Sequence, residues 1–135
     1  MDVLGVHHVA LAVADLDEAI GTYERLYGGQ LELREHLDHQ GVEAAYLRVG
    51  TGRIELLAAI DPETPVGRFF ERRGEAMHHL ALEVEDVGKA IGQLRDSAAE
   101  LIDEVARPGL GGHEVAFIQP DSQHGVLIEV VSNGR

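Results

Sequence analysis

Bulky apolar side chains alternate with small or polar ones in two segments of this chain, residues 6–13 and 77–84. An alternation with a period of two predicts a β-strand whose two faces meet different surroundings. Each segment is followed by an aspartate, Asp15 or Asp86, and by apolar residues at helical spacing, so each aspartate is predicted to cap a helix. Strand-like stretches come after each predicted helix, at residues 30–34, 42–49 and 53–59 and again at residues 101–105, 114–119 and 126–131. The pattern predicts the element order βαβββ twice.

The two halves of this pattern are copies of one another. Residues 7–26 read HHVALAVADLDEAIGTYERL and residues 78–97 read HHLALEVEDVGKAIGQLRDS, and 9 of these 20 positions are identical at a constant offset of 71. A period of this length with only two copies indicates two paired modules rather than a repeat array. We therefore expect an α+β fold in which two paired βαβββ modules form a cupped, mixed, eight-stranded sheet with the helices outside. The alternative, a ferredoxin-like αβ plait, does not explain the matched histidines and glutamates described below.

The length of 135 residues is that of one domain. We expect a single domain, residues 1–135, with module one at residues 4–60, a connector at residues 61–75 and module two at residues 76–132. The connector is short, and Thr64 is predicted to cap a helix that continues through Phe70.

Strand alternation distinguishes the two histidines of each pair. His7 shares its face with bulky apolar side chains, whereas His8 shares its face with small ones such as Ala10. The second copy repeats this arrangement, because His79 falls on the same face as Ala81. The second histidine of each pair is therefore predicted to point to a face with space for a ligand.

A glutamate lies amid apolar residues in the last strand of each module, Glu55 in RIELL and Glu129 in LIEVV. A lone carboxylate in a central strand is costly unless it is paired or binds a metal ion. His8, Glu55, His79 and Glu129 thus occupy equivalent positions of two pseudo-symmetric halves. Two imidazoles and two carboxylates suit a borderline divalent ion such as Co²⁺, Zn²⁺, Mn²⁺ or Ni²⁺. We expect one metal site, with satisfied core histidines and buried ion pairs as the alternative.

The charge balance narrows the classes of partner. The chain has 11 Lys and Arg against 24 Asp and Glu, a formal net charge of −13 at pH 7. This acidity argues against nucleic acid and membrane surfaces as partners, because both attract a basic footprint. The absence of cysteine excludes disulfides and thiolate chemistry. The N-terminus has neither a basic segment nor a long apolar run, so we expect a cytoplasmic protein.

The same residues resemble a known group. HHVALAVADLDEAI, IELL, MHHLALEVEDV and GVLIEVV resemble the vicinal-oxygen-chelate (glyoxalase/bleomycin-resistance) superfamily, over residues 6–131. Within it, QGVEAAYLRVGTGRIELLAAIDPETPVGRFFERRGEAMHH and RPGLGGHEVAFIQPDSQHGVLIEV are similar to the methylmalonyl-CoA epimerase family. By position, this resemblance implies His8, Glu55, His79 and Glu129 as metal ligands. It also implies a homodimer, an acyl-CoA substrate and one divalent ion, with Co²⁺ as the first choice.

The resemblance implies metal-dependent epimerisation of (R)- and (S)-methylmalonyl-CoA, by removal and return of the α-proton through a metal-stabilised enolate. Glu129 is implied as a catalytic acid/base group as well as a ligand. Some epimerases have a second catalytic glutamate two residues after the QGV motif, where this chain has Ala44. The second acid/base group is therefore open. Glu43 is predicted to point to the opposite face of its strand, and a water or a residue of the loop 35–40 are the other candidates.

Two other functions use the same fold. A glyoxalase-type isomerase acting on a glutathione hemithioacetal would have the same ligands but no affinity for CoA. A non-catalytic ligand-binding protein is the other, and the retained set of ligands counts against it. An extradiol dioxygenase, whose iron site needs two histidines and one carboxylate, ranks last.

For the phosphates of CoA, the candidate cations are Arg72, Arg73 and Arg107.

Overall fold

A computed structural model describes residues 1–133 of the chain. Within this range the elements follow one another as β1 (Gly5–Ala12), α1 (Leu16–Tyr27), β2 (Gln30–Leu37), β3 (Val42–Val49), β4 (Gly52–Ala59), α2 (Pro65–Arg73), β5 (Ala76–Glu83), α3 (Val87–Asp96), β6 (Arg107–Pro108), the 3₁₀ turn η1 (Leu110–Gly112), β7 (Glu114–Ile118), the 3₁₀ turn η2 (Pro120–Gln123) and β8 (Ile128–Ser132). The predicted order, βαβββ twice with a helical connector, is confirmed.

The strands form one mixed sheet in the order β2-β3-β4-β1-β5-β8-β7-β6. The first strand of each repeat copy pairs in parallel with the last strand of the same copy, β1 with β4 and β5 with β8. The pairs β2/β3, β3/β4, β6/β7 and β7/β8 are antiparallel. The predicted mixed, eight-stranded α+β fold is therefore confirmed.

The chain divides into two compact units, residues 8–78 and residues 1–7 together with residues 79 onward. Each division of the chain falls between the two histidines of a pair, His7 and His8 or His78 and His79. β1 and β5 thus each contribute to both units. The single domain of residues 1–135 and its module limits remain predictions.

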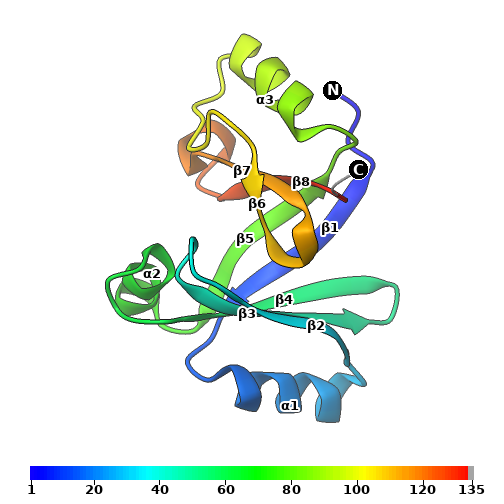
Figure 1. Cartoon of the computed structure of the whole chain (residues 1–135), viewed down its shortest axis with the longest axis vertical. Coiled ribbons are helices and arrows are strands. Elements are labelled where there is room, and N and C mark those ends of the chain that lie inside the picture. The colour runs from blue at the N-terminus through cyan, green and yellow to red at the C-terminus, as the bar shows by residue number, and fades with distance from the viewer. Residues whose placement is uncertain (134–135) are drawn as a thin grey trace. The chain divides into compact units, whose positions relative to one another are not determined.

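In the unit of residues 8–78, α1 packs against one face of β3 and β4 (Figure 1). Asp15 caps this helix as predicted, since its Oδ1 accepts a hydrogen bond from Glu18 N at 3.0 Å. The helix ends at Gly28, which adopts the left-handed conformation with φ 66°. The buried side chains of this interface are apolar: Leu16, Ile20, Ala45, Leu47 and Leu56.

The other unit repeats this packing with α3. Asp86 Oδ1 accepts a hydrogen bond from Lys89 N at 3.0 Å, the same cap as in the first copy. The helix buries its apolar stripe against β7 and β8 through Val87, Ala90, Ile91, Ala116, Ile118 and Val130. In both copies of the repeat, the helix therefore covers the face of the sheet to which the alternation in residues 6–13 and 77–84 assigns the bulky apolar side chains.

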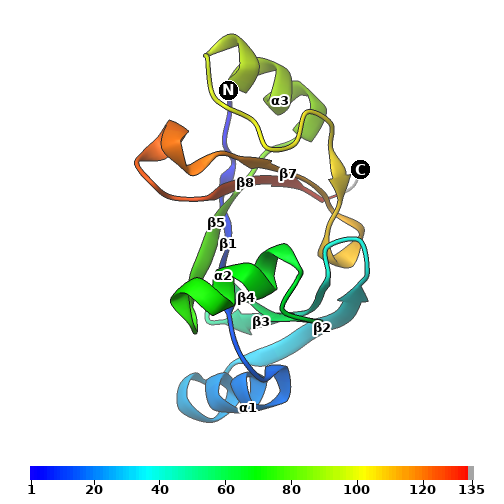
Figure 2. The same cartoon turned by 90° about the vertical axis from the view of Figure 1, so that its left-hand side faces the viewer.

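The predicted connector helix is α2, which begins after Thr64 and continues to Arg73, three residues beyond the predicted end at Phe70. Thr64 Oγ1 accepts a hydrogen bond from Gly67 N at 3.0 Å, and Gly74 ends the helix. Figure 2 shows α1 and α2 on opposite sides of β3 and β4.

The predicted strand at residues 101–105 is wrong. This segment forms an isolated bridge, between Leu101 and Ile118, and the N–H groups of Ile102 and Asp103 both donate to Phe117 O, so it does not form a regular strand. The short strand β6 comes later, at Arg107–Pro108. The side chain of Asp103 takes the place of a backbone acceptor on a neighbouring strand, since its Oδ2 accepts a hydrogen bond from Phe117 N at 2.8 Å. A carboxylate thus satisfies a strand donor that a neighbouring carbonyl would otherwise satisfy.

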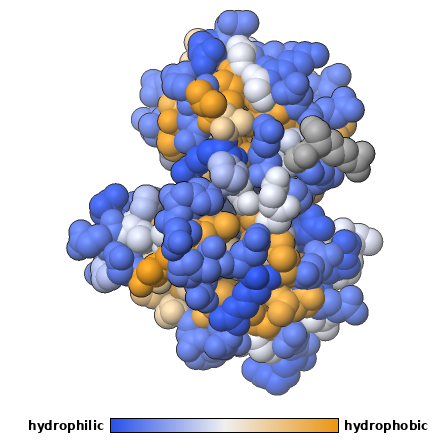
Figure 3. Space-filling model, viewed as in Figure 1, coloured by the Kyte–Doolittle hydropathy of each residue, from blue (hydrophilic) through white to orange (hydrophobic). Residues whose placement is uncertain are grey.

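Hydrophilic side chains cover most of the face shown in Figure 3, in keeping with the acidic composition. Within residues 1–133, no helix has the length and apolar character needed to cross a lipid bilayer.

Candidate metal centre

His8 and Glu55 meet inside the unit of residues 8–78. β1 and β4 run parallel with Ala10 opposite Glu55, which places the side chains of His8 and Glu55 on the same face of the sheet. His8 is 2% exposed and Glu55 is 6% exposed. The distance from His8 Nε2 to Glu55 Oε1 is 3.2 Å. The sequence-predicted pair is therefore formed, buried and in direct contact.

His79 and Glu129 form the equivalent pair in the other unit. Here β5 and β8 run parallel with Ala81 opposite Glu129, as Ala10 lies opposite Glu55 in the first copy. Both side chains are buried, and His79 Nε2 lies 3.7 Å from Glu129 Oε1. All four predicted side chains are therefore buried, each in contact with the partner that its own copy of the repeat provides.

The first histidine of each pair has a different environment. The ring of His7 packs edge-on against His113, with 5.2 Å between centroids, and the ring of His78 packs against Phe69 of α2 at 4.8 Å. These contacts support the assignment of His7 and His78 to the packed face of their strands.

An aromatic ring flanks each pair, and sequence reasoning missed both rings. Tyr46 lies opposite Glu55 in the β3–β4 ladder, and its ring centroid is 5.2 Å from that of His8. Phe117 lies opposite Glu129 in the β7–β8 ladder, and its centroid is 5.1 Å from that of His79. Tyr46 and Phe117 are 71 residues apart, the offset of the histidine repeat. Extension of that offset beyond the helices would have found them.

A guanidinium group covers each ring in turn. Arg53 lies over Tyr46 with its Cζ 5.1 Å from the centroid, and Arg107 lies over Phe117 at 5.4 Å. Arg107 Nε also pairs with Asp103 Oδ2 at 3.3 Å. Cation–π contact and ion pairing position this arginine, one of the predicted CoA-binding cations, next to the second His–Glu pair.

The donor set of each pair fits a divalent ion. Imidazole nitrogen and carboxylate oxygen are ligands of Co²⁺, Zn²⁺, Mn²⁺ and Ni²⁺. Neighbouring ligand atoms, each about 2.1 Å from one ion, lie roughly 3.0 to 3.4 Å apart in octahedral or tetrahedral geometry. The separations of 3.2 and 3.7 Å are close to this range. The residues present therefore fit a metal site.

Comparison with known proteins agrees with this geometry. A family model of the glyoxalase/bleomycin resistance protein/dioxygenase superfamily matches residues 7–117. This chain belongs to that superfamily. The match includes His8, Glu55 and His79 and ends at Phe117, before Glu129.

Several solved structures and curated relatives that are similar to this chain are methylmalonyl-CoA epimerases. The crystal structure of the Mycobacterium tuberculosis epimerase is 37% identical, with a TM-score of 0.92 over 96% of this chain and 88% of that chain. A variant of the Streptomyces coelicolor epimerase in complex with 2-nitronate-propionyl-CoA is 28% identical, with a TM-score of 0.95 over 99% of this chain and 100% of that chain. The ethylmalonyl-CoA/methylmalonyl-CoA epimerase of Cereibacter sphaeroides is 29% identical over 93% of this chain and 95% of its own length.

Glu43 does not share the face of the sheet that carries His8 and Glu55. Its Oε2 lies 3.3 Å from Arg34 Nη2, and its Oε1 lies 3.5 Å from His36 Nδ1. Arg34 also pairs with Asp17 of α1, so this cluster lies on the helix side of the sheet. Ala44, one residue later, is fully buried on the opposite face, that of Tyr46. The prediction that Glu43 points away from the site is confirmed.

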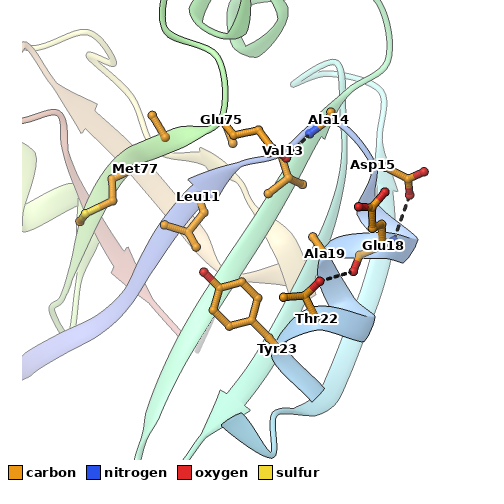
Figure 4. Close-up of a pocket in the computed structure, with 12 residues that line it drawn as sticks. Leu11, Val13, Ala14, Asp15, Glu18, Ala19, Thr22, Tyr23, Glu75 and Met77 are labelled. Carbon is orange, nitrogen blue, oxygen red and sulfur yellow. Dashed lines mark hydrogen bonds between the residues drawn. The ribbon is translucent and has the colours of Figure 1, made fainter. Parts of the chain in front are cut away.

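A pocket of about 460 Å³ is separate from His8, Glu55, His79 and Glu129. It lies between α1 and the neighbouring parts of β1 and β5, where Leu11, Tyr23 and Met77 line it (Figure 4). At one end Glu75 Oε2 accepts a hydrogen bond from Ala14 N at 3.1 Å. This pocket is on the helix side of β1, opposite the face of His8, and is therefore not part of the candidate metal centre.

Proposed function

We propose that this chain is a metal-dependent epimerase that interconverts (R)- and (S)-methylmalonyl-CoA. One observation carries the proposal: each copy of the repeat buries a histidine against a glutamate, at 3.2 Å in one unit and 3.7 Å in the other. The similarity to methylmalonyl-CoA epimerases over almost the whole chain selects the reaction among those of the superfamily.

In this proposal His8, Glu55, His79 and Glu129 hold one divalent ion. Each unit supplies one imidazole and one carboxylate to this set, His8 with Glu55 and His79 with Glu129. Two carboxylates neutralise the charge of a divalent ion in a buried site. We propose Co²⁺ first, with Zn²⁺, Mn²⁺ or Ni²⁺ as alternatives, because the donor set admits all four. When bound, the ion would supply Lewis-acid stabilisation of the charge that develops on the substrate oxygens.

The reaction itself is a proton transfer at the carbon between a carboxylate and a thioester. A carboxylate removes the α-proton and becomes a carboxylic acid, while the electron pair of the broken C–H bond moves into the thioester carbonyl. Return of a proton to the other side of that carbon inverts it. We propose Glu129 as one of the two acid/base residues, because its carboxylate is buried beside His79 and Phe117.

The proposed substrate class is a short branched acyl-CoA. Arg107 is the cation we propose for a CoA phosphate, since it is fixed beside Phe117. Ethylmalonyl-CoA differs from methylmalonyl-CoA by one methylene, which a pocket discriminates by about 10- to 200-fold at most. Both acyl groups therefore belong in the assay.

We further propose a cytoplasmic homodimer. Apolar side chains at and before the start of β1 are exposed, Leu4 by 59% and Val6 by 64%, and burial of such side chains favours association. Size-exclusion chromatography with light scattering tests the dimer, and a Val6→Lys substitution is expected to shift it to monomer.

Proton NMR of methylmalonyl-CoA in D₂O tests the enzymatic proposal. The expected result is rapid loss of the α-proton signal with metal-loaded protein and retention of that signal after a chelator removes the ion. Metal-loaded protein that gives no exchange would overturn the epimerase assignment. In that case isomerisation of a glutathione hemithioacetal is the next assay, since it needs the same ligands.

A further inference from the structure

Inversion of a carbon centre by proton transfer needs two acid/base groups, one on each side of the planar intermediate. A single group would return the proton to the side from which it came. Under the proposed function Glu129 is one of these groups. Glu43 does not serve as the other, because its carboxylate faces Arg34 and His36 on the helix side of the sheet.

The face of β2 to β4 opposite α1 carries the remaining carboxylates of this region. Within the strands β2, β3 and β4 they are Glu32, Glu35 and Glu55, whereas Asp38 lies in the turn after β2 and pairs with His36. Glu55 lies against His8. Glu32 is on this face because a bulge between Leu31 and Leu33 places it toward Arg48 and Arg53.

Glu32 is unsuited to repeated proton transfer. It accepts hydrogen bonds from Arg53 Nε at 2.9 Å and Arg48 Nε at 3.1 Å. The bond from Arg53 is the main reason that the pKa of the Glu32 carboxyl lies below its usual value, and Arg48 adds to this effect. A carboxylate with a lowered pKa is a weak general base, because it takes up a proton less readily than an ordinary carboxylate.

The register of β2 against β3 places Glu35 on the face of the sheet that carries Glu55, opposite α1. Glu35 lies directly opposite Ala44, and its two neighbours, Arg34 and His36, lie opposite Ala45 and Glu43. Both neighbours pair with Glu43 on the helix side. Because side chains alternate along a strand, the half-buried Glu35 points to the other face. Glu35 thus shares its face with the residue opposite it, Ala44, whose small side chain is fully buried.

The distance between Glu35 and the pair of His8 and Glu55 suits a substrate that lies between them. Ala44 is two residues from Tyr46, which lies opposite Glu55. A strand spacing of about 4.8 Å and a rise of about 3.4 Å per residue give roughly 12 Å between the Cα atoms of Glu35 and Glu55. A Cα separation of this size leaves room for a small acyl group between the two residues.

We infer that Glu35 is the second acid/base residue of the reaction. This inference rests on the proposed function. The Glu35 carboxylate takes the α-proton from one enantiomer, and in the reverse direction the Glu35 carboxylic acid returns a proton to the same side. The electron pair of the broken bond moves into the thioester carbonyl, and Glu129 exchanges the proton on the other side. The second acid/base carboxylate thus comes from Glu35 on β2, directly opposite Ala44 on β3.

The test compares α-proton exchange in D₂O for each enantiomer of methylmalonyl-CoA with net epimerisation, using metal-loaded protein. For Glu35→Gln we expect net epimerisation to fall by at least about 100-fold, while exchange from one enantiomer stays within about threefold of wild type because one base remains. The matched control is Glu43→Gln, which changes the same group on the opposite face and should keep both activities. Metal content and the unfolding midpoint confirm that the variants fold.

A second variant transfers the carboxylate from position 35 on β2 to position 44 on β3. Glu35→Ala combined with Ala44→Glu is expected to recover at least about tenfold of the epimerisation lost in Glu35→Ala alone, which a purely structural role would not produce. Net epimerisation by Glu35→Gln within about threefold of wild type would overturn the role of Glu35 and leave the proposed function standing. A wild-type protein that exchanges neither enantiomer would overturn the proposed function, and the role of Glu35 with it.

Discussion

The ring of Tyr46 packs against the imidazole of His8 with 5.2 Å between centroids, and Phe117 repeats the contact with His79 at 5.1 Å. Each ring also lies opposite the glutamate that contacts that histidine. The unit that the chain duplicates is therefore a triplet of histidine, glutamate and aromatic residue. The ring restricts the orientation of the imidazole and keeps water from the pair, both of which strengthen binding of an ion.

The aromatic residue is expected to support metal affinity. Tyr46→Leu removes the ring from His8 and should weaken metal binding by about tenfold, the lower end of the range for residues that orient a ligand. Tyr46→Phe keeps the ring and serves as the control, with affinity close to wild type. Titration of the metal-free protein with Co²⁺ measures both. Equal affinities for the leucine and phenylalanine variants would contradict a role for the ring.

His79 and His78 give a matched pair for the ligand assignment. His79→Ala should lose metal and activity together, by more than the roughly 100-fold that changes around a ligand cost. His78→Ala removes the contact with Phe69 and should lower stability by about 1 to 2 kcal/mol while metal binding persists. Metal analysis and urea unfolding distinguish the two effects. An active, metal-loaded His79→Ala protein would disprove the assignment.

Metal removal is expected to destabilise the fold. An ion that binds only the folded chain adds about 2.7 kcal/mol to the free energy of unfolding at 100 times its dissociation constant. Thermal unfolding with Co²⁺ and with excess chelator should therefore give different midpoints. In Glu55→Gln, which removes one carboxylate ligand beside His8, we expect a smaller difference. The same midpoint with and without ion in the wild type would contradict a structural contribution of the metal.

His36 predicts a pH dependence of stability. Its Nε2 pairs with Asp38 Oδ1 at 2.7 Å and its Nδ1 with Glu43, and these contacts, Asp38 first, raise the pKa of the imidazole above 6.5. A raised pKa in the folded state means that protonation favours folding. This stabilisation is complete below the unfolded value and is lost as the pH rises through the folded one. The stability difference between wild type and His36→Gln should therefore shrink from pH 6 to pH 8 in urea unfolding, and a constant difference would disprove the coupling.

Asp103 is expected to be essential for the edge beside β7. Its Oδ2 accepts a hydrogen bond from Phe117 N and pairs with Arg107 Nε. Asp103→Ala leaves a partly buried N–H without its acceptor and should cost about 1 to 3 kcal/mol. Asp103→Asn keeps an acceptor oxygen and should cost less. Urea unfolding measures both, and equal losses would show that the hydrogen bond to Phe117 is not the cause.

Much of the site follows from periodicity alone. The period of two assigned His8 and His79 to the face of small residues, because side chains alternate on any strand whatever its partners. The apolar runs around Glu55 and Glu129 indicated that those carboxylates need a partner. The repeat then showed that both copies carry the same set, and the aspartate caps at Asp15 and Asp86 are local interactions within a few residues.

Tertiary structure decided which residues of neighbouring strands lie opposite one another. Periodicity gives the face of Glu35 relative to its neighbours, but the residue opposite it depends on where the β2–β3 hairpin closes. Gly41, at φ 69°, closes that hairpin with a hydrogen bond from its N–H to Leu37 O at 2.9 Å, and this turn brings Glu35 opposite Ala44. Asp103 is a second case, because a side chain that replaces a ladder partner leaves no periodic signal. The sequence alone determined which side chains share a face, since alternation is local. Only the tertiary structure determined which of them lie opposite one another, because register depends on where a turn closes and on the hydrogen bonds between paired strands.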